Sequence, residues 1–204
     1  EDMVNSAFEA DIDEPATSQI EQSEHRLFNL ADRSIVTTEW MRRYVVEQYG
    51  VAESKVSVIP NYVLTDVFKP EQRRLVARRR ICFVGRLEEA KDPLLLLEAM
   101  KGLNVELDMI GDGKLRPALE AKAAELGISV RFLGTIPHLE LPTYLNSSTA
   151  FALSSRYENH PKALLEAMAC ELPVIGTNVR GIRDVIQHGV TGYLCDRSPE
   201  GLRH

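Results

Sequence analysis

Residues 150–176 read AFALSSRYENHPKALLEAMACELPVIG, and this stretch decides the fold. Two short apolar runs, Ala150–Leu153 and Val174–Gly176, have the composition of buried strands. A polar loop leads from the first run into a predicted helix, Ala163–Ala169, and Pro161 suits the first position of that helix. A strand, a helix and a second strand joined by short connections predict a βαβ unit of a parallel sheet.

The same alternation continues through the chain from residue 81 onward. Further strands are predicted at Ile81–Val84, Val105–Ile110, Val130–Leu133 and Gly192–Cys195, and helices at Pro93–Met100 (with Asp92 as its cap), Leu115–Leu126, Leu139–Leu145 and Ile182–Ile186. This order predicts a doubly wound parallel α/β sheet, in which ligands bind outside the carboxyl ends of the strands. The loops that begin there start at Gly85, Gly111, Gly134, Ser154 and Gly176.

Before residue 80 the pattern resembles the tail of another α/β domain. Predicted elements are the helices Ser18–Leu30 and Glu39–Tyr49 and the strands Ile35–Thr37 and Val56–Ile59. We therefore divide the chain into an acidic, flexible segment (1–24), the tail of a first domain (25–60), a polar linker (61–80) and a main domain (81–204). Because the chain opens on Glu1 and stops just after a helix start at Ser198, we expect truncation at both ends.

Composition and charge exclude several classes of protein. The net charge is −6, but residues 1–24 hold eight acidic and no basic side chains, which leaves +2 for the other 180 residues. A nearly neutral body argues against nucleic-acid binding. The longest apolar run, Leu94–Leu97, is far short of the ~18 residues of a membrane span. Cys82, Cys170 and Cys195 form no CxxC pair, which argues against a disulfide framework or zinc site and suits a reducing compartment.

Two carboxylates of the opening stretch are candidate site residues. Glu166 lies inside the predicted helix, where it could accept hydrogen bonds from the two vicinal hydroxyls of a ribose. Glu158 lies in the loop beside the N–H groups of the helix start, where an anionic side chain or a phosphate is favoured. The alternatives are helix-terminus stabilisation for Glu158 and a solvated face for Glu166.

Other loops at the same edge offer cations and backbone donors. Arg86 and Lys91 flank the loop after the first main strand and could hold a diphosphate, or they could simply balance Glu88 and Glu89. Gly111-Asp112-Gly113 suggests a nucleotide fingerprint, but no glycine follows at position 116, and no P-loop motif occurs. Gly181 and Ile182 lie at the start of a predicted short helix, so their N–H groups could face a ligand or form a plain turn.

Histidines and arginines outside these loops have open interpretations. His160 and His188 lie at predicted helix ends, where acid–base chemistry competes with capping. A basic cluster precedes the first main strand and is either a solvated linker or a contact for anionic lipid headgroups. Its members are Arg73, Arg74, Arg78, Arg79 and Arg80.

Taken together, these segments resemble the nucleotide-sugar-dependent glycosyltransferases of family 4, retaining enzymes with the two-domain GT-B fold. The likeness covers roughly residues 25–196. It is carried by FVGRL at 83–87 with KDP at 91–93, IGDG at 110–113, the E-x7-E spacing of Glu158 and Glu166 followed by AMAC at 167–170 and PVI at 173–175, GI at 181–182 and GVTGYL at 189–194. Earlier, ADR at 31–33, TTE at 37–39 and VIPN at 58–61 are similar to the end of the first domain and its crossover.

The resemblance implies a role for each motif. Arg86 and Lys91 would neutralise the donor's diphosphate as it leaves, and Glu166 would bind the ribose. Glu158 would lie near the sugar or phosphates. The base would stack near Gly134–Pro137. Residues implied to shape or line the donor pocket are Gly85, Gly111, Gly113, Asn159, His160, Gly181 and Ile182.

The implied activity is transfer of a sugar, with retention, from a nucleoside diphosphate sugar of the UDP or GDP type to a carbohydrate or lipid-linked acceptor. No metal and no other cofactor is implied. Most of the acceptor domain is absent, so we expect a donor-binding fragment that binds nucleoside diphosphates weakly and transfers no sugar. The expected location is cytoplasmic, with peripheral contact to the inner face of the membrane. Alternatives are a GT-B sugar-nucleotide epimerase and a binding module without turnover.

Two positions depart from the family pattern. Family members commonly carry Gly after the AMAC segment, where the helix ends in a left-handed backbone, but this chain has Glu171. A non-glycine residue in that conformation costs about 1–2 kcal/mol. Arg180 stands where a small residue or Pro is usual, which leaves the phosphate side of the expected site less well defined.

Overall fold

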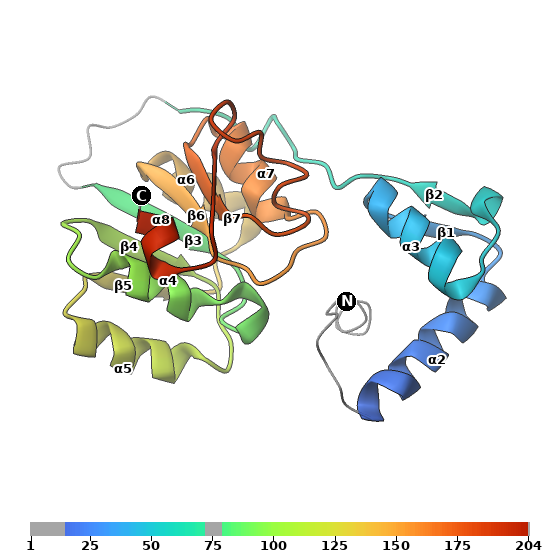
Figure 1. The fold of residues 1–204 in the computed structure, drawn as a ribbon. Helices are drawn as coiled ribbons and strands as arrows, with labels where there is room; N and C mark the ends of the chain where they lie inside the picture. Colours follow the sequence, from blue (N-terminus) through green and yellow to red (C-terminus); the bar gives the residue numbers. More distant parts are fainter. Residues whose placement is uncertain (1–14, 72–78, 204) are drawn as a thin grey trace. The chain divides into compact units, whose positions relative to one another are not determined.

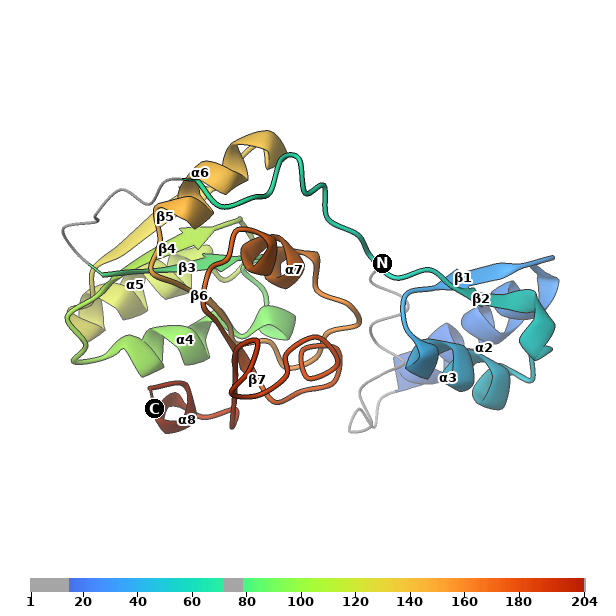
Figure 2. The same cartoon turned by 90° about the horizontal axis from the view of Figure 1, so that it is seen from above.

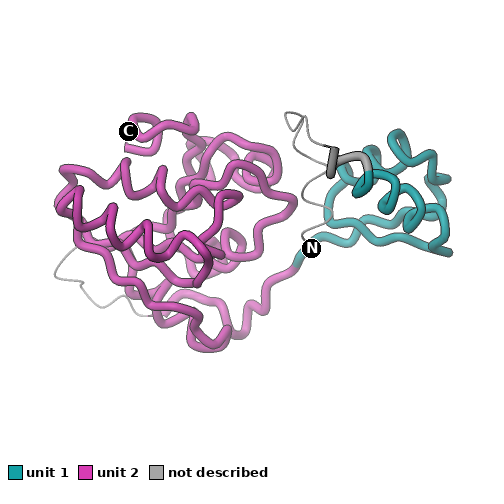
Figure 3. The backbone as a smooth tube through the Cα atoms, turned by 90° about the horizontal axis from the view of Figure 1, so that it is seen from below, with its two compact units in different colours: residues 1–61 teal, residues 62–204 magenta. Residues whose placement is uncertain are grey.

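The computed structural model describes residues 15–71 and 79–203 and divides the chain into two compact units, residues 1–61 and 62–204 (Figure 3). The first unit contains α2 (Pro15–Leu30), β1 (Ser34–Val36), α3 (Glu39–Tyr49), the 3-10 turn η1 (Glu53–Lys55) and β2 (Val56–Val58). Strands β1 and β2 pair in parallel. Helix α3 has both of its ends capped, because the Thr38 hydroxyl accepts a hydrogen bond from the Met41 amide and Gly50 is left-handed.

The second unit is built on a six-stranded sheet whose strands all run parallel, in the order β5-β4-β3-β6-β7-β8. The strands are β3 (Arg80–Val84), β4 (Glu106–Ile110), β5 (Val130–Gly134), β6 (Ala150–Leu153), β7 (Val174–Thr177) and β8 (Tyr193–Cys195). The helices are η2 (Glu89–Lys91), α4 (Pro93–Met100), α5 (Arg116–Leu126), η3 (His138–Glu140), α6 (Leu141–Asn146), α7 (Lys162–Ala169) and α8 (Pro199–Arg203). The strand order reverses between β3 and β6, so the sheet is doubly wound, as the sequence predicts.

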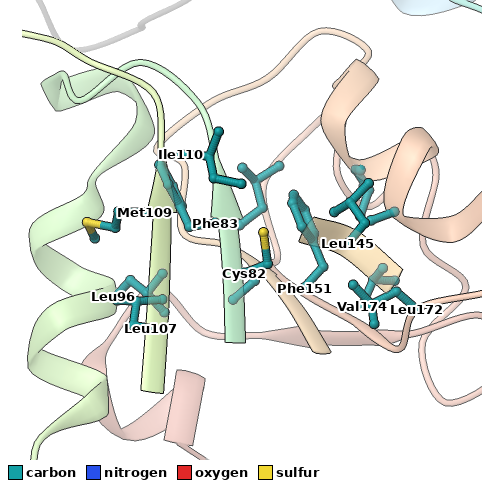
Figure 4. Packing of buried hydrophobic residues seen from close by; sticks show 14 of the residues in the cluster. Cys82, Phe83, Leu96, Leu107, Met109, Ile110, Leu145, Phe151, Leu172 and Val174 are labelled. Atoms are coloured by element: carbon teal, nitrogen blue, oxygen red, sulfur yellow. The ribbon is translucent and has the colours of Figure 1, made fainter. Parts of the chain in front are cut away.

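Helices cover both faces of this sheet. Helices α4, α5 and α8 lie on one face and α6 and α7 on the other (Figures 1 and 2). Buried apolar side chains fill the space between the layers; on one side Leu107 and Met109 of β4 face α4, where Leu96 packs (Figure 4). On the other side, Leu145 of α6 packs near Phe151 of β6. With both faces covered, the carboxyl ends of the strands remain as the edge where loops gather.

The segment expected to be a polar linker contributes to the second unit. Phe68 is 1% exposed and belongs to the core of this unit. Arg80 is the first residue of β3 and forms an ion pair with Glu106 of the neighbouring strand, 2.9 Å apart. Arg79 is exposed, whereas Arg73, Arg74 and Arg78 lie outside the described residues. A solvated role is therefore wrong for Arg80, because its side chain pairs with Glu106 on the sheet. The expected polar linker also supplies an apolar side chain, Phe68, to the core of the second unit.

Three local predictions differ from the structure. Asp92 has a φ of 43° and no side-chain capping bond; its carboxylate pairs instead with Arg156 and Arg197. Pro161 precedes α7 as its cap residue, and the helix begins one residue later. Residues 182–186, predicted as helical, form hydrogen-bonded turns instead, in which the amides of Val185 and Ile186 both donate to Ile182 O.

The helix stop at Glu171 keeps the left-handed backbone expected of glycine. Glu171 has a φ of 55°, its N–H donates to Met168 O, and the N–H of Leu172 donates to Ala167 O. These two bonds form a Schellman motif, and Leu172 is buried beneath it.

Within residues 15–71 and 79–203, no helix combines the length and hydropathy needed to cross a membrane.

Candidate functional site

The loops after β3 and β4 interlock through glycines. A Cβ at Gly111, whose φ is 130°, would lie 2.0 Å from the carbonyl oxygen of Gly85, and one at Gly113 would lie 2.5 Å from that of Leu87. The three glycine N–H groups are already engaged: Gly85 donates to Ile110 O, Gly111 to Gly134 O and Gly113 to the Asp112 carboxylate. These glycines therefore set the shape of the loops, and in this arrangement their amides are directed at other parts of the protein.

The loop after β6 holds the loop after β3 through buried hydroxyl and amide groups. The Ser154 hydroxyl, 0% exposed, lies within hydrogen-bonding distance of the carbonyl oxygens of both Lys91 and Asp92, at 3.0 and 2.9 Å. The Arg156 amide donates to Ala90 O at 2.9 Å. Because β3 and β6 are neighbours in the sheet, these bonds fix the end of one loop against the start of the other.

This arrangement brings Lys91 and Glu158 together. The Lys91 Nζ atom lies 2.5 Å from Glu158 Oε1, and the Ser155 hydroxyl donates to the same oxygen at 2.7 Å. The Glu158 side chain is 8% exposed and that of Lys91 23%. Glu158 thus forms a partly buried ion pair that a hydroxyl group also supports. Its carboxylate is tied to the loop after β3 as well as lying near the start of α7.

Arg86 and the acidic residues of its loop pair differently. Arg86 forms an ion pair with Glu88 at 3.2 Å, which is the balancing role considered for it above. Glu89 instead pairs with Lys114 of the following loop at 2.9 Å. The hydrogen bond from Lys114 lowers the pKa of the Glu89 carboxyl, and the same bond raises the pKa of Lys114. The structure thus brings Lys91 into contact with Glu158 and pairs Arg86 with Glu88.

Glu166 is buried and contacts a histidine from another loop. Its side chain is 6% exposed, and Oε1 lies 2.8 Å from Nε2 of His138 at the start of η3. A solvated-face role for Glu166 is therefore wrong. The His138 ring also packs against Phe68, with 4.9 Å between ring centroids. His138 directly follows residues 134–137, where the base is expected, so the expected base and ribose positions adjoin.

The loop after β7 closes the other side of the Glu158 loop. Gly181 has a φ of 75°, and a Cβ there would lie 2.2 Å from Glu158 O, so only glycine permits this approach. The Gly181 amide donates to the Asp184 carboxylate at 3.3 Å, and the Ile182 side chain is buried in the core. The Thr177 hydroxyl, also buried, donates to Ser155 O at 2.7 Å. Gly181 thus contributes by allowing close packing.

The histidines named from sequence have separate environments. Burial lowers the pKa of His160, and the Asp184 carboxylate acts against that shift. A lowered pKa keeps the imidazole neutral near pH 7. His188 accepts a hydrogen bond at Nδ1 from the Leu194 amide and packs on the Tyr193 ring, which is a structural role. Asn159 contributes a carbonyl oxygen to the surroundings of Gly181.

Sequence reasoning missed three polar residues of this edge. His138, Ser155 and Thr177 each bond to another part of the site. Ser155 lies within the stretch 150–176, but none of the three is singled out as a site residue from the sequence. The available signal was position, because each lies at or just beyond the carboxyl end of a predicted strand. Among the described residues, no group of three or more His, Cys, Asp or Glu side chains is arranged to hold a metal ion.

A doubly wound parallel sheet whose loops gather at its carboxyl edge defines a Rossmann-like α/β domain. A family model described as glycosyl transferases group 1 matches residues 66–202, and one described as Glycosyltransferase Family 4 matches residues 11–67. The chain belongs to the group 1 glycosyltransferase family.

Curated relatives agree with this assignment. D-inositol 3-phosphate glycosyltransferase of Thermobispora bispora is 30% identical over 92% of this chain and 49% of the relative. The protein of the same name from Mycobacterium tuberculosis H37Ra is 32% identical over 94% of this chain and 43% of the relative. The chain thus spans about half the length of these relatives or less.

Solved structures share the fold. Sucrose-phosphate synthase from Thermosynechococcus elongatus superposes with a TM-score of 0.84 at 22% identity, covering 98% of this chain and 54% of that one. Anabaena HepE in complex with UDP and glucose gives 0.83 at 21% identity over 93% and 57%. The lipopolysaccharide outer core galactosyltransferase WaaB gives 0.65 at 27% identity over 82% and 49%. The GT-B-like parallel sheet predicted from sequence is confirmed.

Proposed function

We propose that residues 62–204 form the donor-binding unit of a retaining family 4 glycosyltransferase, which moves a sugar from a nucleoside diphosphate sugar to an acceptor hydroxyl. Membership of the group 1 family supports sugar transfer, and the family 4 match supports the finer assignment. Because the chain spans about half of its curated relatives, transfer is proposed for a protein of their length. For the chain alone we propose weak nucleoside diphosphate binding without transfer.

The observation that carries this proposal is the contact between Lys91 and Glu158 at the carboxyl edge of the sheet. When the bond between sugar and diphosphate breaks, negative charge grows on the leaving diphosphate. An ammonium group held in place by a carboxylate is a preorganised partner for that charge. Arg86, 46% exposed on the same loop, would supply a second cation when its contact with Glu88 opens.

The nucleoside would occupy the neighbouring loops. Glu166 would accept hydrogen bonds from the ribose hydroxyls, and the base would stack over residues 134–137, next to His138. Glu158, Asn159 and His160 would border the sugar and phosphates. Glycines Gly85, Gly111, Gly113 and Gly181, together with Ile182, would hold the loops in register around the donor.

Donor and acceptor classes follow from chemistry and from the relatives. A similar fold in HepE holds UDP and glucose, and two relatives are named for an inositol phosphate acceptor, which supports a UDP-type donor and a polyhydroxylic acceptor. GDP remains the second donor type, and carbohydrate or lipid-linked hydroxyls the wider acceptor class. We propose that the reaction needs neither metal nor other cofactor and takes place in the cytoplasm, at the inner face of the membrane.

The test is a titration of the 204-residue chain with UDP, GDP and ADP, followed by thermal unfolding. At 100 times Kd, one nucleoside diphosphate should add about 2.7 kcal/mol and raise the Tm by a few degrees. Glu166→Ala should abolish the shift, whereas the control Glu120→Ala, on the exposed surface of α5, should keep it. A flat response from folded protein, or a shift that survives Glu166→Ala, would contradict the proposal.

A second arm separates binding from turnover. The chain is incubated with UDP-glucose and with myo-inositol phosphate or glucose as acceptor, and the products are separated by chromatography. Release of UDP with formation of a glycoside by this chain would contradict the claim that transfer needs the longer protein. Binding without glycoside formation is the expected result.

A further inference from the structure

The contact between His138 and Glu166 has no counterpart in the motifs that point to the family. Glu166 comes from the middle of α7 and His138 from the 3-10 turn after β5, 28 residues earlier in the chain. The Glu166 side chain is 6% exposed, whereas that of His138 is 50% exposed. Burying a carboxylate costs free energy unless hydrogen-bond donors satisfy it, so the contact with His138 helps to stabilise Glu166 in its buried position.

The geometry defines which atoms interact. An ionised carboxylate only accepts hydrogen bonds, so His138 donates its Nε2–H to Oε1 across 2.8 Å. His138 contacts the Glu166 carboxylate through one of its two oxygens, Oε1. The imidazole thus engages Oε1, and Oε2 is the oxygen considered below for a ligand.

The orientation of the His138 ring is fixed from the opposite side. Its ring packs on Phe68 at 4.9 Å between centroids and a 49° interplanar angle, and Phe68 is 1% exposed within the core. The imidazole therefore has a rigid apolar neighbour on one side and the carboxylate on the other. A side chain oriented in this way can hold its hydrogen-bond partner at a defined angle.

We propose that His138 is a positioning residue for the ribose: its Nε2–H holds Oε1 of Glu166, so that Oε2 faces the 2′- and 3′-hydroxyls of the nucleoside diphosphate. This inference rests on the proposed function, because it takes Glu166 as the ribose acceptor. Loss of the imidazole would leave the carboxylate free to rotate and would remove its charge-assisted hydrogen bond. Recognition of the ribose hydroxyls would then weaken, whereas recognition of base and phosphates would not.

The test compares UDP and GDP with their 2′,3′-dideoxy counterparts, by calorimetry on the 204-residue chain. In the wild type, the ribo compound that binds should bind about tenfold or more tightly than its dideoxy counterpart, since one or two hydrogen bonds to a charged group are lost. His138→Ala should lower the affinity for the ribo compound about tenfold and leave that for the dideoxy compound nearly unchanged. His138→Gln, which retains an N–H donor, should restore part of the preference.

Leu139→Ala is the matched control, because Leu139 lies in the same turn and is 72% exposed. It should leave the preference for ribose intact, and thermal unfolding should show that all variants are folded. If His138→Ala leaves the ratio of ribo to dideoxy affinity unchanged, whether or not both affinities fall, the inference is overturned while the proposed function stands. Tighter UDP binding by His138→Ala would show that the imidazole blocks Glu166 and would also overturn it. Wild-type protein that binds none of the compounds would overturn the proposed function, and this inference with it.

Discussion

Lys91 Nζ and Glu158 Oε1 lie 2.5 Å apart, although 67 residues separate them in the sequence. The parallel pairing of β3 with β6 places their loops side by side, and the buried Ser154 hydroxyl ties the two loops together. The charge pair therefore depends on the sheet rather than on the flexibility of either loop. Its position at the carboxyl edge gives the molecule a fixed cation where a diphosphate is expected.

Replacing Lys91 should weaken binding of phosphates in particular. Lys91→Ala removes the ammonium group and is expected to reduce the affinity for UDP or GDP about tenfold, the effect of one charge-assisted contact. The affinity for the corresponding nucleoside, which has no phosphate, should change little. Lys122→Ala is the matched control, because this half-buried lysine of α5 also forms an ion pair with a glutamate, Glu125. An equal loss for nucleoside and nucleoside diphosphate, measured by calorimetry, would mean that Lys91 supports the loops instead.

Adding a methyl group at Gly111 should be far more damaging than adding one at Gly127. Both have positive φ, but the added Cβ at Gly111 would lie 2.0 Å from a backbone oxygen, whereas the one at Gly127 would have nothing within 4 Å. We expect Gly127→Ala to cost about 1 kcal/mol and Gly111→Ala about 3 kcal/mol or more in the free energy of unfolding. Urea denaturation monitored by circular dichroism measures both. Similar losses in the two variants would contradict the interlock of the loops.

Glycine at position 171 should stabilise the protein. Glu171 occupies the left-handed position of a Schellman motif with a φ of 55°. Glu171→Gly relieves the steric cost and should raise the free energy of unfolding of the second unit by about 1 kcal/mol. Glu171→Ala keeps the cost and serves as the control for loss of the carboxylate. If Ala and Gly variants have the same stability in urea, the backbone at this helix stop carries no strain.

Stability of the first unit should depend on pH through Glu24. Burial raises the pKa of Glu24 above its ordinary value of 4.5, and the hydrogen bond from Tyr49 acts in the opposite direction. A carboxyl whose pKa is raised by folding stabilises the fold while it is protonated, and this contribution is lost as the pH rises through the folded-state pKa. Between pH 4.5 and 7 the wild type should therefore lose stability relative to Glu24→Gln, by up to about 1.4 kcal/mol per pH unit.

The readout for Glu24 is fluorescence of Trp40, the single tryptophan of the chain, which packs in the first unit. Urea unfolding at pH 4.5 and at pH 7 gives the stability difference between wild type and variant at each pH. Glu47→Gln, on the exposed face of α3, is the control and should show no such change. A difference that stays constant with pH would mean that the Glu24 carboxyl titrates alike in the folded and unfolded chain.

The strands and the edge that carries the site could be predicted because apolar runs such as Ala150–Leu153 are short and alternate with stretches of helical period, which favours buried strands. Parallel topology then places Lys91, Glu158 and Glu166 at one edge without any knowledge of distances. The positions of Phe68 and Arg80 could not be predicted, because the segment around them has a polar composition. Tertiary packing places Phe68 in the core, and strand pairing makes Arg80 the first residue of β3. The partner of Glu166 could not be predicted, since contact between residues 28 apart depends on how η3 turns after Gly134.

Local signals failed where two chemistries compete for one residue. Asp92 before Pro93 has the sequence of a helix cap, but Arg156 and Arg197 both bind its carboxylate, and a left-handed backbone takes the place of the cap. Arg86 has the sequence context of a diphosphate ligand, but in the structure it forms an ion pair with Glu88, which is the charge-balancing alternative. The partners of Asp92 come from positions that pattern and spacing do not relate to it, whereas Glu88 lies two residues from Arg86 and is the alternative that the sequence offers.

The glycine interlock of the loops after β3 and β4 has a consequence for how donor preference can change in evolution. Gly85, Gly111 and Gly113 donate their amides to acceptors within the protein, so internal bonds set the shape of these two loops, which we call the platform. Substitutions on the platform would disturb every donor alike. A new donor preference is therefore expected to arise from changes in the side chains that border these loops and project towards the ligand. The glycine backbone beneath them would stay constant.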